Sequence, residues 1–378
     1  DTAAAASIPA ESFVGKINYN QLLLNGGINF NFYYEAGSGQ QQKQQFIYVE
    51  TQPGAGVYTW TDYNNNGVKE LNEFDIAVYQ DQANYIKVYI QTNDYINILK
   101  NQLSTVLNIN PAAFLKQQKK YAKVLSRFSN QTAYSSSNQT TDDDIISSLN
   151  PFVTDVLDTN LTLSNATFRN SFFYNRSSTK FGADITWQSL HNKNLTPNGY
   201  ELRKQQTSQL NVRWNLTINY SLIVLFENGM SESRSEFFLN RNYKIQSYKT
   251  QPVFSYQPNT AFRISLIYLY SNKQNIYDET AEKATQNNGS LELKFSSVKK
   301  GIATFRVNYI DMNYNGDINS PVAYDMLEGL QNGRNITWTI NLQRNLSRVL
   351  QLSINYEGRK SANVKTINTA GVQARAFF

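Results

Sequence analysis

The chain has 378 residues, a formal net charge of +6, no cysteine and a single histidine, His191. These counts exclude a disulfide framework, a thiolate metal site and a multi-histidine metal centre, and the dispersed lysines and arginines do not indicate nucleic-acid binding. No apolar run approaches the roughly 18 residues of a spanning helix. The mean hydropathy of −0.50 remains compatible with a membrane barrel, because the lumen and loops of a barrel are polar.

The first third of the chain is expected to contain five strands. Residues 1–10 have neither the basic start nor the apolar core of a secretory signal. We expect them to be a linker or the start of a fragment, with residues 11–378 forming the barrel. The five expected strands are Phe13–Leu24, Gly27–Glu35, Gln42–Thr51, Ile96–Ile109 and Tyr121–Tyr134.

One motif between these strands has the chemistry of a metal site. Residues 62–73 follow the spacing of a twelve-residue calcium loop, with a glycine at the sixth position for the sharp turn. A hard cation prefers oxygen ligands, and this spacing wraps them around one point. The alternative is an ordinary Asn-Gly turn. Residues 52–95 are expected to form an external insertion, and the predicted calcium ligands are Asp62, Asn64, Asn66, the carbonyl of Val68, Glu70 and Glu73.

From about Asn160 onward, apolar and polar residues alternate in eleven segments. Ile336, Trp338 and Ile340, for example, alternate with Thr337 and Thr339. Because successive side chains of a strand point to opposite faces, each segment has one apolar and one polar face. Charged residues fall on the polar face, as a lumen requires. The predicted lumen charges are Arg213, Arg263, Glu292, Arg306, Glu357 and Arg375.

The connections between these segments alternate between long and short. Outer-membrane barrels have short periplasmic turns and long external loops, so this asymmetry predicts which end of the wall faces outside. The connections expected to be long and external are Leu190–Arg203, Asn228–Asn242, Ser271–Asn288, Met312–Arg334 and Gly358–Ala370.

The last strand ends on an aromatic residue, Phe378. Aromatic strand ends belong to the girdles of transmembrane barrels, and a terminal aromatic would also serve as the signal for barrel insertion. The residues assigned to that signal are Gly371, Ala374, Ala376 and Phe378.

These patterns predict an all-β fold, a transmembrane antiparallel up-and-down β-barrel of about 14–16 strands, or the C-terminal part of a larger barrel. All five upstream strands together with the eleven would give sixteen; if the first three belong to an external module, thirteen remain. No enzyme is expected, because His191 has only Ser189 nearby and no spacing supports a catalytic triad.

Several segments resemble large, mostly uncharacterised outer-membrane proteins of Bacteroidetes. The resemblance rests on the segments 58–62, 72–77, 324–330 with 333–335, 350–360 and 373–378. It implies a Gram-negative outer membrane, association with surface lipoproteins or protein-export machinery, and a longer protein of which this chain is the C-terminal part. It carries no catalytic residues.

The function expected from the sequence is a pore, or the membrane scaffold of a larger transport, export or surface-lipoprotein complex. The alternative is a surface binding or adhesion protein, anchored by the barrel and displaying calcium-ordered external loops. The expected partners are outer-membrane lipid and other outer-membrane or surface lipoprotein subunits, with the calcium loop outside the cell and no nucleic acid.

Overall fold

The computed structural model describes residues 12–115, 120–141, 148–153, 160–196, 199–277, 282–297, 301–347, 349–361 and 364–377. The wall strands are β1 (Val14–Leu23), β2 (Ile28–Glu50), β5 (Tyr85–Ile109), β6 (Phe128–Thr140), β7 (Leu161–Tyr174), β8 (Phe181–Thr196), β9 (Gly199–Asn215), β10 (Tyr220–Ser235), β11 (Tyr243–Asn259), β12 (Phe262–Asn275), β13 (Lys283–Ser297), β14 (Gly301–Tyr314), β15 (Gly333–Asn345), β16 (Leu350–Ser361) and β17 (Ile367–Ala376). The short elements are β3 (Tyr58–Trp60), β4 (Phe74–Ile76), α1 (Lys120–Leu125), α3 (Pro321–Leu327) and the 3₁₀ turns η1 (Leu71–Glu73), η2 (Gln80–Gln82), η3 (Pro111–Ala113) and η4 (Leu239–Arg241).

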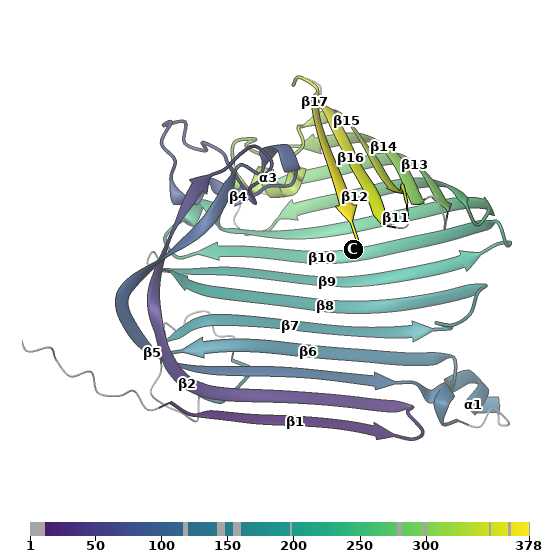
Figure 1. The fold of residues 1–378 in the computed structure, drawn as a ribbon, viewed down its shortest axis with the longest axis horizontal. Coiled ribbons are helices and arrows are strands. Elements are labelled where there is room, and N and C mark those ends of the chain that lie inside the picture. Colours follow the sequence, from purple (N-terminus) through teal and green to yellow (C-terminus); the bar gives the residue numbers. More distant parts are fainter. Residues whose placement is uncertain are drawn as a thin grey trace, which may run out of the picture.

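The wall is a single antiparallel up-and-down sheet (Figure 1). Seventeen strands are hydrogen-bonded together, and fifteen of them form the wall once β3 and β4 are set aside. Each wall strand pairs with the next one along the chain, from β1 with β2 to β16 with β17. In the described residues β1 and β17 each pair on one side only. The predicted all-β, up-and-down fold is confirmed, including eleven strands after residue 160.

One predicted boundary upstream is wrong. The segments Gly27–Glu35 and Gln42–Thr51 are one continuous strand, β2, so the wall has fifteen strands rather than sixteen. The glycines between them suggest a turn, but they stay paired with β1 and β5. A Cβ at Gly37 would come within 2.7 Å of the Phe13 carbonyl oxygen. Glycine is there because two backbones approach closely, which is another ordinary use of glycine in strands.

Two further expectations about the connections are wrong. The predicted strand Tyr121–Tyr134 begins later, because Lys120–Leu125 forms α1 and β6 starts at Phe128. Several connections predicted to be long are short: β8 reaches Thr196 and β9 starts at Gly199. The reason is that hairpins continue to pair through backbone hydrogen bonds after the apolar alternation ends. A connection of the expected length remains between β14 and β15, and it contains α3.

The two faces of the wall have opposite polarity, and the apolar face is the exposed one. We call the face that carries α3 the inner face and the opposite one the outer face. On the outer face, Trp187, Leu266 and Val372 are 50%, 56% and 70% exposed. On the inner face, Ser255 and Ser265 share a hydrogen bond of 2.9 Å, and Asn308 donates to Thr337 at 2.7 Å. A water-soluble sheet buries its apolar face, so this arrangement fits a wall surrounded by lipid.

Within the described residues, no helix is long and apolar enough to cross a bilayer.

A compact apolar cluster lies where α3 packs on the inner face. The inner side of β14 changes from polar to apolar toward its end, through Ile310, Met312 and Tyr314. These side chains, with others from β11 and β13, contact the helix and bury it, so that Ala323 is 0% exposed. The members of the cluster are Ile245, Ala284, Ile310, Met312, Tyr314, Val322, Ala323, Met326, Leu327 and Leu330.

At the end of the wall that carries the predicted calcium loop, residues 148–153 cover part of the outer face. Asn101 donates to the Ser148 carbonyl at 2.6 Å, and Tyr34 donates to the Leu149 carbonyl at 2.6 Å. Asn138 donates to the carbonyl of Pro151 at 3.3 Å. Polar outer side chains are tolerated at this end of the wall because protein covers them. The lipid-facing band therefore lies farther toward the opposite end of the wall.

The face assignment makes a prediction about two adjacent residues of β12. Leu266→Arg places a charge on the outer face and should lower the free energy of unfolding in a lipid bilayer by about 2–4 kcal/mol. Ile267→Arg, which faces inward, should change it by less than about 1 kcal/mol. Equilibrium unfolding by denaturant from lipid vesicles measures both values. Equal costs at the two positions would contradict the face assignment.

Candidate functional site

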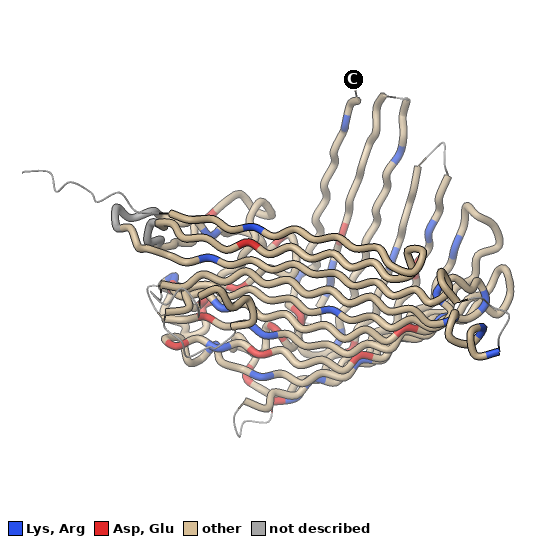
Figure 2. The backbone as a smooth tube through the Cα atoms, turned by 90° about the horizontal axis from the view of Figure 1, so that it is seen from below, with Lys and Arg blue, Asp and Glu red and all other residues tan. Residues whose placement is uncertain are grey.

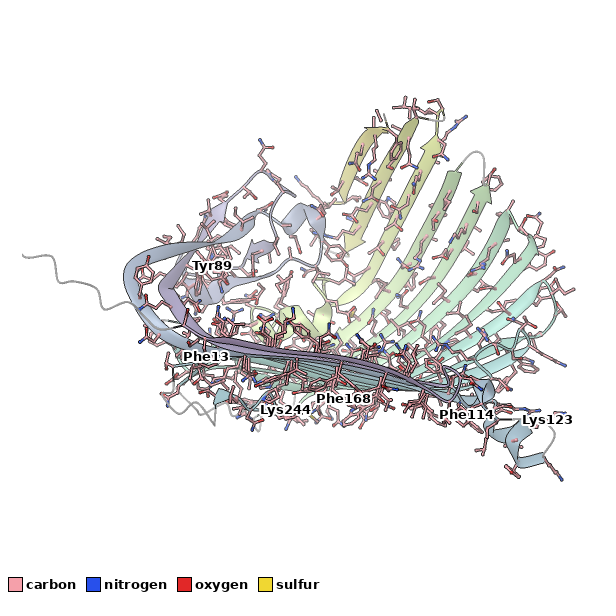
Figure 3. The ribbon with its side chains drawn as sticks, turned by 60° about the horizontal axis from the view of Figure 1, so that its bottom comes forward. Phe13, Tyr89, Phe114, Lys123, Phe168 and Lys244 are labelled. Atoms are coloured by element: carbon pink, nitrogen blue, oxygen red, sulfur yellow. The ribbon has the colours of Figure 1, made fainter. Side chains whose placement is uncertain are left out.

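The strands β2 and β5 continue beyond the wall and carry a separate unit across the end of the wall that holds the predicted calcium loop. β5 pairs with β6 only from Leu99 onward, whereas its pairing with β2 extends to Tyr85 opposite Glu50. A register shift between Gln42 and Gln44 interrupts this hairpin, and such bulges bend strands. We call residues 40–97 the cap. Figure 1 shows the hairpin bending over toward α3, and Figure 3 shows Tyr89 on the cap, with Phe114 and Lys123 at the opposite end of the wall.

The cap has its own aromatic core. The rings of Tyr48 and Phe74 are stacked, with centroids 4.1 Å apart and planes 11° from parallel. Phe74 also meets the edge of Tyr85 at 5.0 Å and is 3% exposed. The bounds differ from the predicted insertion of residues 52–95, because residues 85–95 belong to β5. The excursion itself runs between Glu50 and Tyr85 and contains β3 and β4.

The predicted calcium loop is wound on its own side-chain oxygens. The Asp62 carboxylate accepts hydrogen bonds from the backbone N–H groups of Asn66 at 3.1 Å and Gly67 at 2.8 Å. The Asn64 and Asn66 side-chain oxygens accept from the N–H groups of Asn66 and Val68. Asn65 and Gly67 have φ of 57° and 72°, which is the left-handed region that favours asparagine and glycine. The first half of the loop therefore turns tightly, as its spacing predicts.

The second half of the loop holds its carboxylates differently. Glu73 is 0% exposed and accepts hydrogen bonds from the Trp60 indole at 2.9 Å and from the N–H groups of Tyr63 and Glu70 at 3.3 Å each. Glu70 accepts from the amide nitrogen of Asn64 at 3.0 Å. Among the described residues, no three acidic, histidine or cysteine side chains form a metal-binding group. A cation here would need the amide and carbonyl oxygens of Asn64, Asn66 and Val68 as well, and calcium binding stays a prediction.

A hydroxyl of the loop itself, that of Tyr63, connects the loop to the rest of the cap. Tyr63 donates to the Asp75 carboxylate at 2.6 Å. Burial, and then the negative charge of Asp75, raises the pKa of the Tyr63 hydroxyl well above its ordinary value. The Tyr63 hydroxyl therefore remains a hydrogen-bond donor throughout the physiological pH range. Asp75 in turn pairs with Arg241 of η4, in the connection between β10 and β11.

Three contacts join the cap to distant segments of the chain. Arg359 of β16 forms a two-pronged ion pair with Asp81, with both distances 2.7 Å, and its guanidinium lies 4.2 Å from the Tyr79 ring centroid. Arg241 of η4 binds Asp75 at 2.9 Å. Tyr324 of α3 donates to the Ile76 carbonyl at 3.2 Å and accepts from the Val78 N–H at 3.1 Å. These contacts hold the cap against elements 166–278 residues away in sequence.

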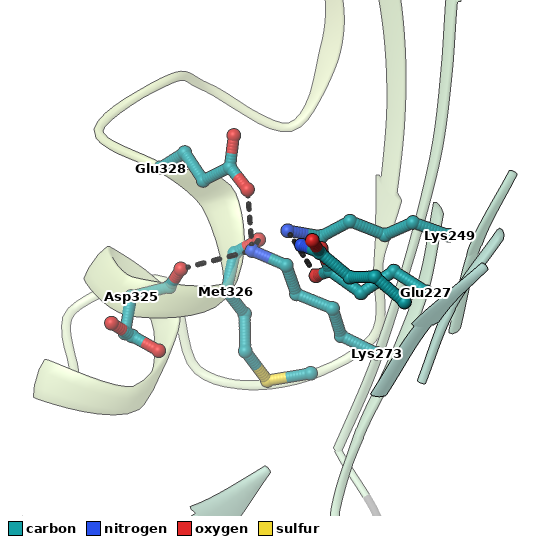
Figure 4. A network of polar contacts seen from close by, with 7 residues as sticks. Glu227, Lys249, Lys273, Asp325, Met326 and Glu328 are labelled. Atoms are coloured by element: carbon teal, nitrogen blue, oxygen red, sulfur yellow. Dashed lines mark hydrogen bonds and ion pairs between the residues drawn. The ribbon is translucent and has the colours of Figure 1, made fainter. Parts of the chain in front are cut away.

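A lysine holds α3 against the wall (Figure 4). The Lys273 ammonium of β12 donates to the carbonyls of Asp325 at 3.2 Å and Met326 at 3.1 Å, and to the Glu328 carboxylate at 2.8 Å. The helix begins at Ser320, whose hydroxyl accepts from the Ala323 N–H at 3.1 Å. A cation at the carboxyl end of a helix is favourable because the last carbonyls lack partners within the helix.

The pKa values of the two acids near this lysine are shifted in opposite directions. Burial raises the pKa of Asp325, although the positive charge of Lys273 opposes the rise. Burial alone would also raise the pKa of Glu328, but the charge and hydrogen bond of Lys273 outweigh it and lower that pKa. Beside them, Lys249 of β11 pairs with Glu227 of β10 at 3.4 Å (Figure 4). The inner face under α3 therefore carries closely spaced charges of both signs.

The predicted lumen charges lie on the same inner face but do not gather at one place. The strand register puts all six on the side of Ser290, Asn308 and Arg359. Arg306 pairs with Glu292 across neighbouring strands, Arg263 binds Gln257 at 2.9 Å, and Arg213 donates to the Ser178 carbonyl at 2.8 Å. Glu357 lies beside Arg359 on β16, and Arg375 lies opposite Gln351. Figure 2 shows acidic and basic residues interspersed along the wall.

The residues assigned to the insertion signal fall on both faces of β17. Ala374 and Ala376 lie opposite Leu352 and Leu350 on the apolar outer face, and Gly371 lies opposite Asn355 on the inner face. Phe378 lies outside the described residues. The role of these residues in insertion stays a prediction.

No protein-family model and no curated protein matches the chain. Among solved structures, it is similar to the outer membrane channel DcaP of Acinetobacter baumannii, with 9% identity over 93% of this chain and 98% of that chain and a TM-score of 0.35. It is also similar to the toluene transporter TodX of P. putida, with 8% identity, 96% and 82% coverage and a TM-score of 0.27. At these identities the activity of neither protein can be inferred for this chain. Its own sheet, with an apolar exposed face and a polar inner face, has the construction of a transmembrane β-barrel wall.

The pairing of Arg359 with Asp81 makes a prediction about the cap. In a double-mutant cycle of Arg359→Gln and Asp81→Asn, we expect a coupling energy of about 1–3 kcal/mol, because the pair is two-pronged and largely buried. The exposed pair Lys69–Glu50, examined through Lys69→Gln and Glu50→Gln, should give less than about 1 kcal/mol. Hydrogen exchange of the cap amides reports its opening free energy. Equal coupling in the two cycles would show that Arg359 does not hold the cap.

Proposed function

We propose that this sheet forms the wall of an outer-membrane pore whose external mouth is narrowed by α3 and the cap. The observation that carries the proposal is the pair of opposite faces: exposed Leu, Trp and Val side chains outside, and hydrogen-bonded or ion-paired polar side chains inside. A wall that only anchored a surface domain would have no need of so many polar side chains on its inner face. Channels of this type enclose water between such faces.

The narrowing follows from the contacts of α3 and the cap. Lys273 fixes α3 to β12, and the apolar cluster around Met326 fixes it to β11, β13 and β14. Arg241, Tyr324 and Arg359 then hold the cap beside α3. Because the three contacts are polar, they can exchange with water when the cap moves, whereas the apolar cluster under α3 cannot. The cap is therefore the part of the mouth that we expect to open.

Conductance tests this proposal. In planar bilayers, the double variant Asp75→Asn/Asp81→Asn should conduct more than the wild-type chain, because it loses the charged contacts to Arg241 and Arg359. Glu50→Gln is the matched control, because Glu50 is also an acid of the cap but forms its ion pair with exposed Lys69 of the same unit. If neither the wild type nor the double variant conducts, the barrel is an anchor rather than a pore.

We further propose that calcium orders the loop of residues 62–73 outside the cell. The tight turn at Asn65 to Gly67 and the inward carboxylate of Asp62 support it. The loop lies next to Asp75 and the contact to Arg241, so a cation that stiffens the loop would also stiffen the cap. Calcium would then act as a structural ion of the mouth.

Titration of chelator-treated protein with calcium checks the metal. Asp62→Asn should weaken calcium binding about tenfold or more, because the loop loses the charged ligand at its first position. Asp317→Asn, in the connection between β14 and β15, should leave binding unchanged. If the wild-type chain does not bind calcium, residues 62–73 form an ordinary Asn-Gly turn and the proposed site is wrong.

We also propose that further strands complete this wall, as in the C-terminal part of a larger barrel. Every wall strand is antiparallel to the next, so the first and the fifteenth, β1 and β17, run in the same direction. Antiparallel closure therefore requires an odd number of additional strands between them. A direct β1–β17 seam would be parallel, unlike every other pair in the sheet.

Engineered cysteines test the seam, and the chain has no native cysteine to interfere. The pair Ile354→Cys/Val372→Cys joins paired positions of β16 and β17 and should form a disulfide on mild oxidation. Val372→Cys combined in turn with Ile17→Cys, Tyr19→Cys or Gln21→Cys should not cross-link within one chain. Electrophoresis without reductant distinguishes the products. An intramolecular bond in any of the three would show direct closure.

A further inference from the structure

A cavity lies between the cap and the inner face of the wall. Its volume is about 790 Å³, within the roughly 300–1,000 Å³ typical of small-molecule sites. The cap forms one side with Tyr48, Phe74 and Lys87, and the ends of β8 and β9 form the other side with Asn194 and Arg203. The cavity is therefore at the mouth of the proposed pore.

One side of the cavity is a set of adjoining aromatic rings. Phe46 meets Tyr48 edge-on at 5.8 Å and Tyr89 at 6.4 Å, and Tyr48 stacks on Phe74. Tyr89 is 51% exposed, although it belongs to the water-exposed cap rather than to the lipid-facing wall. Phe46 and Phe74 are buried behind it, so the rings open to a ligand are Tyr89 and the partly exposed Tyr48. They present an apolar surface with hydroxyl groups at its edge, which suits a ring-shaped ligand that carries polar substituents.

The cavity also carries an excess of positive charge. Three cations line it, Lys87, Arg203 and Arg241, against one acid, Glu201. Arg241 is already paired with Asp75. Within the described residues, Lys87 and Arg203 make no ion pair or hydrogen bond, and the Lys87 ammonium lies 3.7 Å from the Phe46 ring centroid. Two cations on opposite sides of one cavity are thus available to an anionic group, which Arg binds best as a carboxylate or phosphate.

The remaining lining supplies neutral hydrogen-bonding groups. Asn194 and Thr196 of β8, Gln139 of β6 and Gln45 of the cap all reach the cavity. Amides and hydroxyls both donate and accept, so they suit the hydroxyl groups of a ligand. An aromatic carboxylate would use the rings and the cations but would leave these amides to water.

We propose that this cavity binds an acidic sugar, with a sugar ring against Tyr48 and Tyr89 and its carboxylate between Arg203 and Lys87. Asn194 and Gln139 then bind the hydroxyl groups. The site requires only the cap and the ends of β6, β8 and β9 in their present places, so it stands whether or not the barrel conducts.

Calorimetric titration of the full chain in detergent tests the site with trigalacturonic acid as the probe. The wild-type chain should bind it, and the uncharged methyl-ester form should bind about tenfold more weakly or worse, because it lacks the charge that Arg203 recognises. Arg203→Gln on the wall and Lys87→Gln on the cap should each weaken binding of the acid by a similar factor. Arg169→Gln, a cation on the inner face of β7 outside the cavity, should leave it unchanged.

Heat-modified mobility in electrophoresis shows that each variant is folded before it is titrated. Equal affinities for the acid and its ester would overturn the role of the cations. Tighter binding of benzoate than of trigalacturonic acid would assign the cavity to aromatic carboxylates instead. Failure of both probes to bind the wild type, or equal weakening by Arg169→Gln, would overturn the site, and none of these results depends on conductance.

Discussion

The arrangement of this chain depends on an apolar face that no other part of the protein covers over most of its area. Leu266, Trp187 and Val372 are half-exposed or more, and so are many other large outer side chains. Water would penalise that surface at about 25 cal/mol for each Å², whereas the lipid tails of a bilayer would not. Once lipid takes the outer face, the inner face no longer has to supply a hydrophobic core. Serines, asparagines and ion pairs can then line it, and separate elements can fold inside.

The cap and α3 use this freedom in two different ways. The helix is held by burial, through Met326 and Ile310, and by one lysine at its carboxyl end. The cap is held mainly by polar contacts from Arg241, Tyr324 and Arg359, which come from three separate connections and strands. Burial holds α3 on the wall, whereas the polar contacts of the cap can be exchanged for contacts with water. The cavity with Lys87 and Arg203 lies between the fixed wall and this less firmly held unit.

Much of the wall could be predicted because strand alternation is local. Ile336, Trp338 and Ile340 share a face whatever the rest of the chain does, and the eleven strands after residue 160 follow from that rule. The upstream boundary failed at Gly37, because a glycine in a turn and a glycine under a close backbone look the same in sequence. α3 had a visible signal, Ser320 before Pro321 with Gly329 after the helix. Ile310, Met312 and Tyr314 on the otherwise polar face of β14 marked the place where it docks.

The contacts of the mouth could not be predicted in the same way. Arg359 and Asp81 are 278 residues apart, and no periodicity connects them. Glu73 fits the twelfth position of a calcium loop, yet its burial under Trp60 depends on how β3 meets the loop. Spacing alone indicates which oxygens a loop contains, and tertiary packing decides where each of them points.

The central claim is that the two faces of each wall strand meet lipid and water, and single cysteines along β12 test it most directly. Cysteines placed one at a time at Ile264, Ser265, Leu266, Ile267, Tyr268 and Leu269 would be reconstituted in lipid vesicles and exposed to a water-soluble thiol reagent. We predict that reactivity alternates, with Ile267 and Leu269 modified and Ile264, Leu266 and Tyr268 protected. Ser265 should react more slowly than Ile267, because it is 4% exposed and packed against Ser255. Uniform modification along the strand would contradict the account, because it would place both faces of β12 in water.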